Sequence, residues 1–247
     1  MKKLLVDKVF IVHVRENNTV RREFITNQME SHGIEFEFML HGDIVDLNED
    51  NMKEYFLPEL ISEHPAPRES CSFKHLYIYK EIVNRGVKSV LIFEDDIFLD
   101  DKFVEIFNAT MKEVQERTDI ESDRLFISYE NSLLEFVSKK DLTEGQYLYK
   151  SNNTRCAGAY FITHSVAQKI LNYTLENKLG VGIDWQHKKM LNEGIIDVYW
   201  CHPAIAEQGS HNGRLASLLD DKKSGFLRQL SWKIQRFYKK NIRGLFK

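Results

Sequence analysis

The chain has 247 residues, of which 43% are hydrophobic and 29% are charged, and its formal net charge is -3. This balance is typical of a globular protein with a substantial core, and the length suits one large α/β domain. The 3 cysteines, Cys71, Cys156 and Cys201, lie far apart without a CxxC pair. They argue against a disulfide framework or a zinc knuckle and favour a reducing compartment.

The amino terminus, MKKLLVDKVF, starts like a signal peptide. However, Asp7 and Lys8 interrupt its apolar run, and no small-residue cleavage site follows. No segment has the roughly 18 unbroken apolar residues of a membrane-spanning helix. We therefore expect a cytoplasmic protein, peripheral to the inner face of the cytoplasmic membrane if its carboxyl terminus binds lipid.

The amino-terminal part of the chain predicts a strand, a helix and a second strand. Residues 8–14 form a β-branched run, and residues 20–32 keep helical spacing up to Gly33. Residues 34–40 then alternate apolar and polar side chains. A β-α-β start predicts a parallel pair of strands joined by a right-handed crossover.

Residues 41–69 are irregular and predict a surface excursion with one short helix. Beyond them we expect helices over 70–85, 102–117, 164–178 and 185–192, and strands over 89–93, 124–129, 146–151, 158–163 and 195–200. The strands over 146–151 and 158–163 are predicted to be neighbours. The order of elements predicts an α/β fold with a mostly parallel sheet flanked by helices. Such sheets bind ligands beyond the carboxyl ends of their strands.

An acidic turn follows the predicted strand SVLIF, at the edge where such a sheet binds ligands. Glu94, Asp95 and Asp96 are consecutive, and carboxylates this close cannot all stay ionised without a counter-charge. Mg²⁺ or Mn²⁺ would supply one, binding through one or two carboxylates plus substrate phosphates. The alternative is a solvated junction without function. Asp100 and Asp101 are expected to favour the start of the next helix.

Several motifs appear in a fixed order between residues 8 and 218. They are VFIVHV, Arg21-Arg22, HGIEFEFM, Cys71-Ser72-Phe73-Lys74-His75, LIFEDD, AGAYFITHSVAQKIL, Gly182-Ile183-Asp184-Trp185 and Pro203-Ala204-Ile205-Ala206-Glu207-Gln208. Together they resemble glycosyltransferase family 25, the lipopolysaccharide and collagen-type galactosyltransferase group. The chain departs from the family pattern at His13, Ser70 and Lys74, near the expected nucleotide-sugar pocket.

The resemblance implies a GT-A-like, Rossmann-type fold. It also implies metal-assisted, inverting transfer of a hexose, most simply galactose, from a UDP-sugar to a glycan or glycolipid acceptor in surface glycan synthesis. The candidate catalytic residues are Asp184 and Glu94, the candidate Mn²⁺ or Mg²⁺ ligands are Asp96, Glu94 and His211, and the candidate donor contacts are His75, Asp95, Arg15, Arg21, Arg155, Gln208 and Ser210.

Some of these residues have a structural alternative. Asp184 either accepts the proton of an acceptor hydroxyl or caps a helix. Arg21 either steadies a diphosphate or lies on a solvated helix face. His75 is either a pocket residue or a buried core histidine, and His202 competes with His211 as the histidine that completes the metal shell.

A basic tail follows an acidic body, and we divide the chain into a catalytic domain over 1–221 and a tail over 222–247. From Lys222 to Lys247 there are nine basic residues and no acid. Within 226–247, apolar and basic side chains fall on opposite sides of a helix. This pattern is typical of a helix that lies on anionic lipid. The alternative is a helix packed on the domain. The acidic body disfavours nucleic acid as a partner.

A second class of function stays open. The departures at His13, Ser70 and Lys74 would allow a non-catalytic nucleotide-sugar or glycan-binding protein on the same fold. A metal-dependent phosphoesterase is a third reading, but the sequence offers no second His/Asp ligand set. Turnover of a UDP-sugar with Mn²⁺ separates the first two.

Overall fold

The computed structural model describes residues 3–16, 18–62, 64–219 and 224–241. Its strands are β1 (Lys8–Val12), β2 (Glu37–Met39), β3 (Ser89–Glu94), β4 (Ile97–Leu99), β5 (Leu125–Ser128), β6 (Leu148–Ser151), β7 (Ala159–Thr163), β8 (Asp197–Cys201) and β9 (Ala206–Gln208). Its α-helices are α1 (Thr19–His32), α2 (Glu49–Tyr55), α3 (Pro67–Asn84), α4 (Phe103–Glu116), α5 (His164–Asn177), α6 (Ile183–Asn192), α7 (Gly209–Asn212) and α8 (Phe226–Asn241). Short 3₁₀ turns cover Ile44–Asp46, Pro58–Leu60 and Lys139–Asp141.

Seven strands form the central sheet, in the order β2-β1-β3-β7-β5-β8-β6. β1 is parallel to β2 and β3, and β5 is parallel to β8, while β7 is antiparallel to both β3 and β5. β6 is antiparallel to β8. Five strands therefore run one way and β6 and β7 run the other, which confirms the mostly parallel α/β sheet. The carboxyl ends of β1, β3, β5 and β8 lie on one edge.

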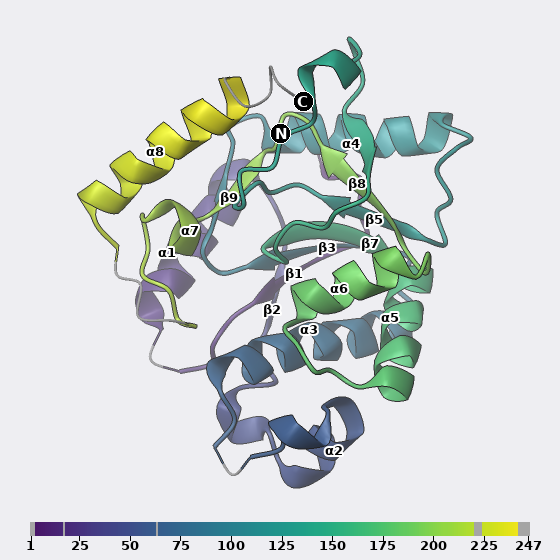
Figure 1. Cartoon of the computed structure of the whole chain (residues 1–247), viewed down its shortest axis with the longest axis vertical. Helices are drawn as coiled ribbons and strands as arrows, with labels where there is room; N and C mark the ends of the chain where they lie inside the picture. Colours follow the sequence, from purple (N-terminus) through teal and green to yellow (C-terminus); the bar gives the residue numbers. More distant parts are fainter. Residues whose placement is uncertain (1–2, 17, 63, 220–223, 242–247) are drawn as a thin grey trace.

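Helices cover both faces of the sheet, and the strand sequences explain why. In β3, Val90 and Ile92 belong to one core cluster, and Leu91 and Phe93 belong to the other. This alternation places apolar side chains on both faces. The first cluster packs against α3, α5 and α6, and the second against α1 and α4. Figure 1 shows α3, α5 and α6 gathered on one side of the sheet and α4 on the other.

The predicted pairing of the strands over 146–151 and 158–163 is wrong. β7 lies between β3 and β5, and β6 pairs with β8 at the edge of the sheet. Burial explains the separation. Four of the five residues of β7 are buried, as in a central strand, whereas β6 is buried only in its first half. A small antiparallel sheet of β4 and β9, which joins Ile97–Leu99 to Ala206–Gln208, was not predicted.

The helix predicted in the tail is present as α8, at the outer edge of the molecule (Figure 1). It contacts the body through polar side chains. Arg236 pairs with Glu207, Arg228 donates a hydrogen bond to the carbonyl of Ser210, and Lys239 donates to the carbonyl of Leu133. The predicted domain boundary at 221/222 and the basic residues Lys222, Lys223, Arg243 and Lys247 lie outside the described residues. Among the described helices, none is both long and apolar enough to cross a bilayer.

Candidate functional site

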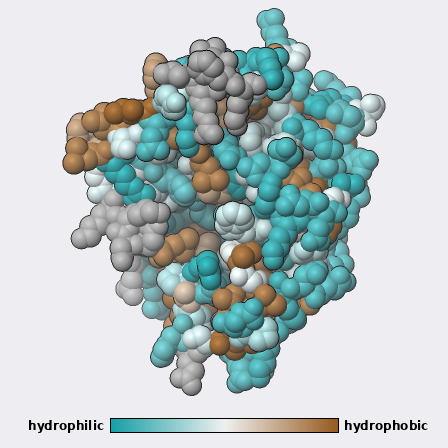
Figure 2. Space-filling view, viewed as in Figure 1, coloured by the Kyte–Doolittle hydropathy of each residue, from teal (hydrophilic) through white to brown (hydrophobic). Residues whose placement is uncertain are grey.

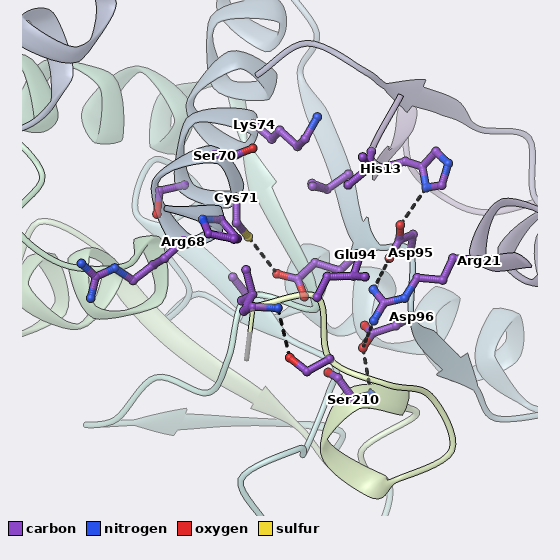
Figure 3. A pocket seen from close by; sticks show the side chains of 18 of the residues that line it. His13, Arg21, Arg68, Ser70, Cys71, Lys74, Glu94, Asp95, Asp96 and Ser210 are labelled. Carbon is purple, nitrogen blue, oxygen red and sulfur yellow. Dashed lines mark hydrogen bonds and ion pairs between the residues drawn. The ribbon is translucent and has the colours of Figure 1, made fainter. Parts of the chain in front are cut away.

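The acidic turn forms one wall of a cavity of about 750 Å³ at the carboxyl ends of β1 and β3. Segments far apart in sequence line this cavity: the link from β1 to α1, the first turns of α3, the turn after β3, the start of α6 and the β9–α7 junction. The close-up in Figure 3 shows Glu94, Asp95 and Asp96 between cationic side chains, with Ser210 below them. The site therefore lies at the edge of the sheet that the sequence indicated.

Asp95 is held by three donors. His13 Nδ1 lies 2.7 Å from its Oδ2, Asn18 Nδ2 lies 3.3 Å from the same oxygen, and Arg21 Nη1 donates to its Oδ1 at 2.7 Å (Figure 3). Asp95 and Arg21 are buried. These bonds fasten the β1–α1 link to the acidic turn. Asp95 is thus bound by protein donors, but it also lines the cavity, and its contact with the donor substrate stays a prediction.

Asp96 has a different environment. Its Oδ2 accepts a hydrogen bond from the backbone N–H of Ser210 at 2.9 Å, and Arg21 Nη2 lies 3.9 Å away. Its Oδ1 is buried and has no hydrogen-bond partner among the described residues. Burial, followed by the nearby charge of Glu94, raises the pKa of Asp96 to about 6. A buried acceptor oxygen without a donor is costly, and a cation would satisfy it.

Glu94 connects three elements across the cavity. Gln208 Nε2, at the end of β9, donates to Glu94 Oε2 at 2.5 Å. On the other side, Cys71 Sγ and His75 Nε2 of α3 lie 3.8 and 3.5 Å from Glu94 Oε1. Its side chain keeps 19% exposure, unlike the nearly closed Asp95 and Asp96. Glu94 is therefore the carboxylate of the turn that is most accessible from the cavity.

His75 lies behind the cavity wall and does not line it. Its Nδ1 is 2.8 Å from the Tyr160 hydroxyl, which is 2.6 Å from the Tyr79 hydroxyl. Tyr79 in turn lies 2.9 Å from Nε2 of His187. Burial lowers the pKa of His187 to about 3, so that imidazole is neutral. His75 therefore reaches Glu94 from outside the cavity lining and is held by a buried chain of hydrogen bonds.

Several cationic side chains line the cavity. Arg15 donates to Asp46 Oδ2 at 2.5 Å and lies 3.8 Å from Asp43, while Lys74 pairs with Asp43 at 2.6 Å. Arg68 pairs with Glu69 of the same helix at 3.0 Å. Arg15, Lys74, Arg68, Arg21 and Arg228 all line the cavity. This combination of carboxylates and guanidinium groups suits a ligand that carries phosphate, with or without a cation.

Asp184 also lines the cavity, on the wall formed by α6. Gly182 is the N-cap of that helix and Asp184 is its second residue, so the alternative that Asp184 is the helix cap is wrong. Its Oδ1 accepts the backbone N–H of Trp185 at 2.9 Å, and burial raises the pKa of its carboxyl. A carboxyl with a raised pKa that faces a cavity is better suited to proton transfer than an ordinary aspartate.

The other predicted residues divide into two groups. Gln208, Ser210 and His211 line the cavity, and His211 Nε2 lies 3.9 Å from the Cys156 sulfur. Arg155 does not line it: its guanidinium is buried, donates to the carbonyls of Glu130 and Glu135, and stacks 4.5 Å from the Trp200 ring. Its predicted contact with a diphosphate does not fit this position, because these partners hold it inside the protein. His202 also lies outside the cavity lining.

Glu130 was not among the predicted site residues. It follows β5, is fully buried, and accepts hydrogen bonds from the backbone N–H of Gly158 at 2.6 Å and from Ser132. Burial raises its pKa to about 7, opposed in part by these bonds and assisted by Glu94. One signal was available: an acid just after a buried strand parallel to β3 reaches the same edge of the sheet.

Comparison with known proteins identifies a family for this chain. Residues 6–185 match the sequence model described as glycosyltransferase family 25 (LPS biosynthesis protein). One similar solved structure is a glycosyltransferase involved in the glycosylation of the major capsid of PBCV-1, with 8% identity, a TM-score of 0.41, and coverage of 92% of this chain and 100% of that one. Another is mannose-1-phosphate geranyltransferase from Thermus thermophilus, with 11% identity, a TM-score of 0.25, and coverage of 92% and 48%. TM-scores this low establish no shared fold, so the family match carries the assignment.

Proposed function

Since this chain belongs to glycosyltransferase family 25, we propose that the cavity at the acidic turn binds a UDP-hexose, most simply UDP-galactose. The hexose is transferred, with inversion at its anomeric carbon, to a hydroxyl of a glycan or glycolipid acceptor in lipopolysaccharide or other surface glycan synthesis. In this proposal the chain is a GT-A-type enzyme that uses Mn²⁺ or Mg²⁺.

One observation carries this proposal: the buried Asp96 Oδ1 has no partner among the described residues and lies beside a cavity that also holds several cationic side chains. A cavity of about 750 Å³ falls within the range of small-molecule sites. Its carboxylates suit a divalent cation, and its arginines suit the oxygens of a diphosphate. A cavity beside α8, by contrast, has cationic side chains but a single carboxylate, Glu207.

Asp96 and Glu94 of the turn offer oxygen ligands to a divalent cation, and His211 lines the same cavity. Among the described residues, the potential metal-ligand atoms that lie within 4.8 Å of one another are those of Cys71, His75 and Glu94. Asp96 and His211 would therefore have to move closer to share an ion with Glu94. A bound Mn²⁺ or Mg²⁺ would supply Lewis acidity that neutralises the charge of the leaving diphosphate. Arg21 reaches Asp96 at 3.9 Å and limits the repulsion among the carboxylates in the absence of the cation.

Asp184 is the proposed base. It takes the proton of the acceptor hydroxyl while that oxygen forms a bond to the anomeric carbon of the hexose. The bond from the anomeric carbon to the diphosphate oxygen breaks in the same step, and UDP leaves with the bonding electron pair. A single displacement of this kind inverts the anomeric carbon. Asp184 lies on the wall of the cavity that α6 forms.

We also propose that α8 lies on an anionic membrane surface, close to a glycolipid acceptor. Six large apolar residues of α8 are exposed: Phe226, Leu227, Leu230, Ile234, Phe237 and Tyr238. An exposed apolar stripe on a helix with basic flanks is typical of helices that bind at the lipid interface. Arg228 of the same helix lines the large cavity, so such a contact would hold the cavity near the membrane.

A thermal-shift screen of UDP-sugars, with and without Mn²⁺, tests donor binding. The proposal predicts that a UDP-hexose together with Mn²⁺ raises Tm by about 5–10 °C at ligand concentrations near 100 Kd. Asp96→Asn keeps the shape of the side chain and should abolish the Mn²⁺-dependent part of the shift. Asp100→Asn, four residues further along the chain and outside the cavity lining, is the control and should keep it. An equal shift in Asp96→Asn would refute the assigned cation site.

A further inference from the structure

The two sides of α8 differ in a way that a simple packed helix does not explain. Its polar side faces the body through Arg228, Arg236 and Lys239, and its apolar side faces outward. Phe226 and Leu227 are 76% and 79% exposed. In Figure 2 this apolar surface is the brown patch at the upper left, over α8. The hydrophobic effect would bury these side chains in an ordinary terminal helix.

A second cavity, of about 330 Å³, lies between the polar side of α8 and the β9–α7 segment. Four cationic side chains line it, namely Arg214, Lys233, Arg236 and Lys240, together with a single carboxylate, Glu207. Arg236 pairs with Glu207. Within the described ranges, Lys233 and Lys240 form no ion pair. The cavity therefore keeps an excess of positive charge after its one acid is neutralised.

One buried N–H donor in this lining also lacks an acceptor. The indole Nε1 of Trp232 is buried and has no hydrogen-bond partner among the described residues, whereas the neighbouring Asn212, only 3% exposed, interacts with Glu207. Buried donors are nearly always paired. An anion with several acceptor oxygens would satisfy the indole N–H and the surplus charge, and phosphate has that chemistry.

We propose that this second cavity binds the phosphate of an anionic phospholipid headgroup. The inference rests on the proposed membrane contact of α8 and adds a specific headgroup site to it. Phe237 lines the cavity and is also 65% exposed as part of the apolar side of α8. The cationic cavity thus continues into the apolar surface. A phospholipid has the complementary arrangement: its anionic headgroup would lie in the cationic cavity and its acyl chains beside Phe237.

A headgroup in this cavity would fix how α8 lies on the membrane. The cavity includes Gln229, which donates to the carbonyl of Gly213, and Glu207 of β9, next to Gln208. Gln208 in turn donates to Glu94. Bound lipid would therefore hold the donor cavity in one orientation relative to the surface that carries a glycolipid acceptor.

The test measures binding of the full chain to two kinds of vesicle. One is pure phosphatidylcholine, and the other, anionic kind also contains a minority of phosphatidylglycerol. Wild type should bind the anionic vesicles more tightly. Lys233→Gln and Lys240→Gln should each lower that binding by about fivefold or more. Lys239→Gln is the matched control, because it removes the same charge from the same helix outside the lining, and it should lower binding less. Equal losses in all three variants would overturn the site in favour of diffuse electrostatic attraction.

Trp232→Phe tests the phosphate site independently of electrostatic attraction, because it removes one N–H donor without changing the charge of the protein. It should weaken binding to the anionic vesicles by about tenfold and leave binding to phosphatidylcholine unchanged. In NMR spectra, titration with glycerol phosphate should shift the indole N–H signal that this variant lacks. Loss of glycerol phosphate binding with unchanged vesicle binding would contradict a lipid as the source of the phosphate.

The vesicle experiments distinguish failure of the proposed membrane contact from failure of the proposed headgroup site. Leu227→Ser with Leu230→Ser alters the apolar side alone and should reduce binding to both kinds of vesicle. If wild type binds neither kind, the proposed membrane contact fails and the headgroup site fails with it. If wild type binds both kinds equally, only the headgroup site fails. Neither result bears on UDP-sugar binding, which the thermal-shift experiment tests.

Discussion

At the scale of single residues, three consecutive carboxylates have three different environments. Asp95 accepts bonds from His13, Asn18 and Arg21 and holds the turn in place. Asp96 has one satisfied oxygen and one buried oxygen without a partner in the described part of the chain. Glu94 faces the cavity between α3 and β9. Asp95 therefore has a structural role, whereas Asp96 and Glu94 are the carboxylates available for the proposed chemistry.

Glu130 gives a test of the electrostatics at this edge of the sheet. Its pKa is raised by burial from 4.5 to about 7, so folding favours the protonated form. Its stabilising contribution is fully present below about pH 4.5 and is lost as the pH rises through about 7. Glu130→Gln does not ionise; its amide oxygen can accept from the N–H of Gly158, and its amide N–H can donate to the Ser132 hydroxyl. The variant should be up to about 3 kcal/mol more stable than wild type at pH 8.

Urea unfolding of both proteins between pH 4.5 and pH 8 measures this difference. The wild-type free energy of unfolding should fall across that range, and the slope should be smaller in Glu130→Gln. Equal slopes in the two proteins would show that Glu130 ionises normally in the folded state.

At the scale of elements, the site depends on how β9 and α7 pack against the acidic turn. β4 and β9 pair directly after the turn, and the N–H of Gly209 donates to the carbonyl of Asp96 at 2.7 Å. The start of β7 approaches the same place. A Cβ at Gly158 would lie 2.6 Å from Cγ of Gln208. Gly158 is therefore needed for Gln208 to reach Glu94.

Gly158→Ala should push Gln208 away from Glu94. We expect a loss of about 1–3 kcal/mol in the free energy of unfolding, as for other overpacked sites, together with weaker binding of UDP-hexose and Mn²⁺. Gly225→Ala is a suitable control, since nothing lies within 4 Å of a Cβ at that position. Calorimetric titration and urea unfolding of the two variants measure both effects. Donor affinity equal to wild type in Gly158→Ala would show that Gln208 has no part in the site.

At the scale of the whole molecule, sequence patterns predicted the helices and strands better than their pairing. The buried strand that ends at Glu94 and the helix that contains His75 are where their periodicity indicated. The insertion of β7 between β3 and β5 was not predictable from local spacing, because pairing depends on contacts distant in sequence. The same limit applies to Arg155. Its charge suggested a phosphate contact, but tertiary packing buries it against Trp200.

We propose above that the cavity beside the acidic turn catalyses transfer from a UDP-hexose, with Asp184 as the base. The most direct measurement is the rate of UDP release from the UDP-sugar that gives the largest thermal shift, with Mn²⁺ and with water or a glycan as acceptor. Wild type should release UDP, and removal of Mn²⁺ by a chelator should stop it. Asp184→Asn should lower kcat by about 10²–10⁴-fold while the donor still binds. A wild-type rate in Asp184→Asn, or donor binding without any release of UDP by wild type, would contradict the account.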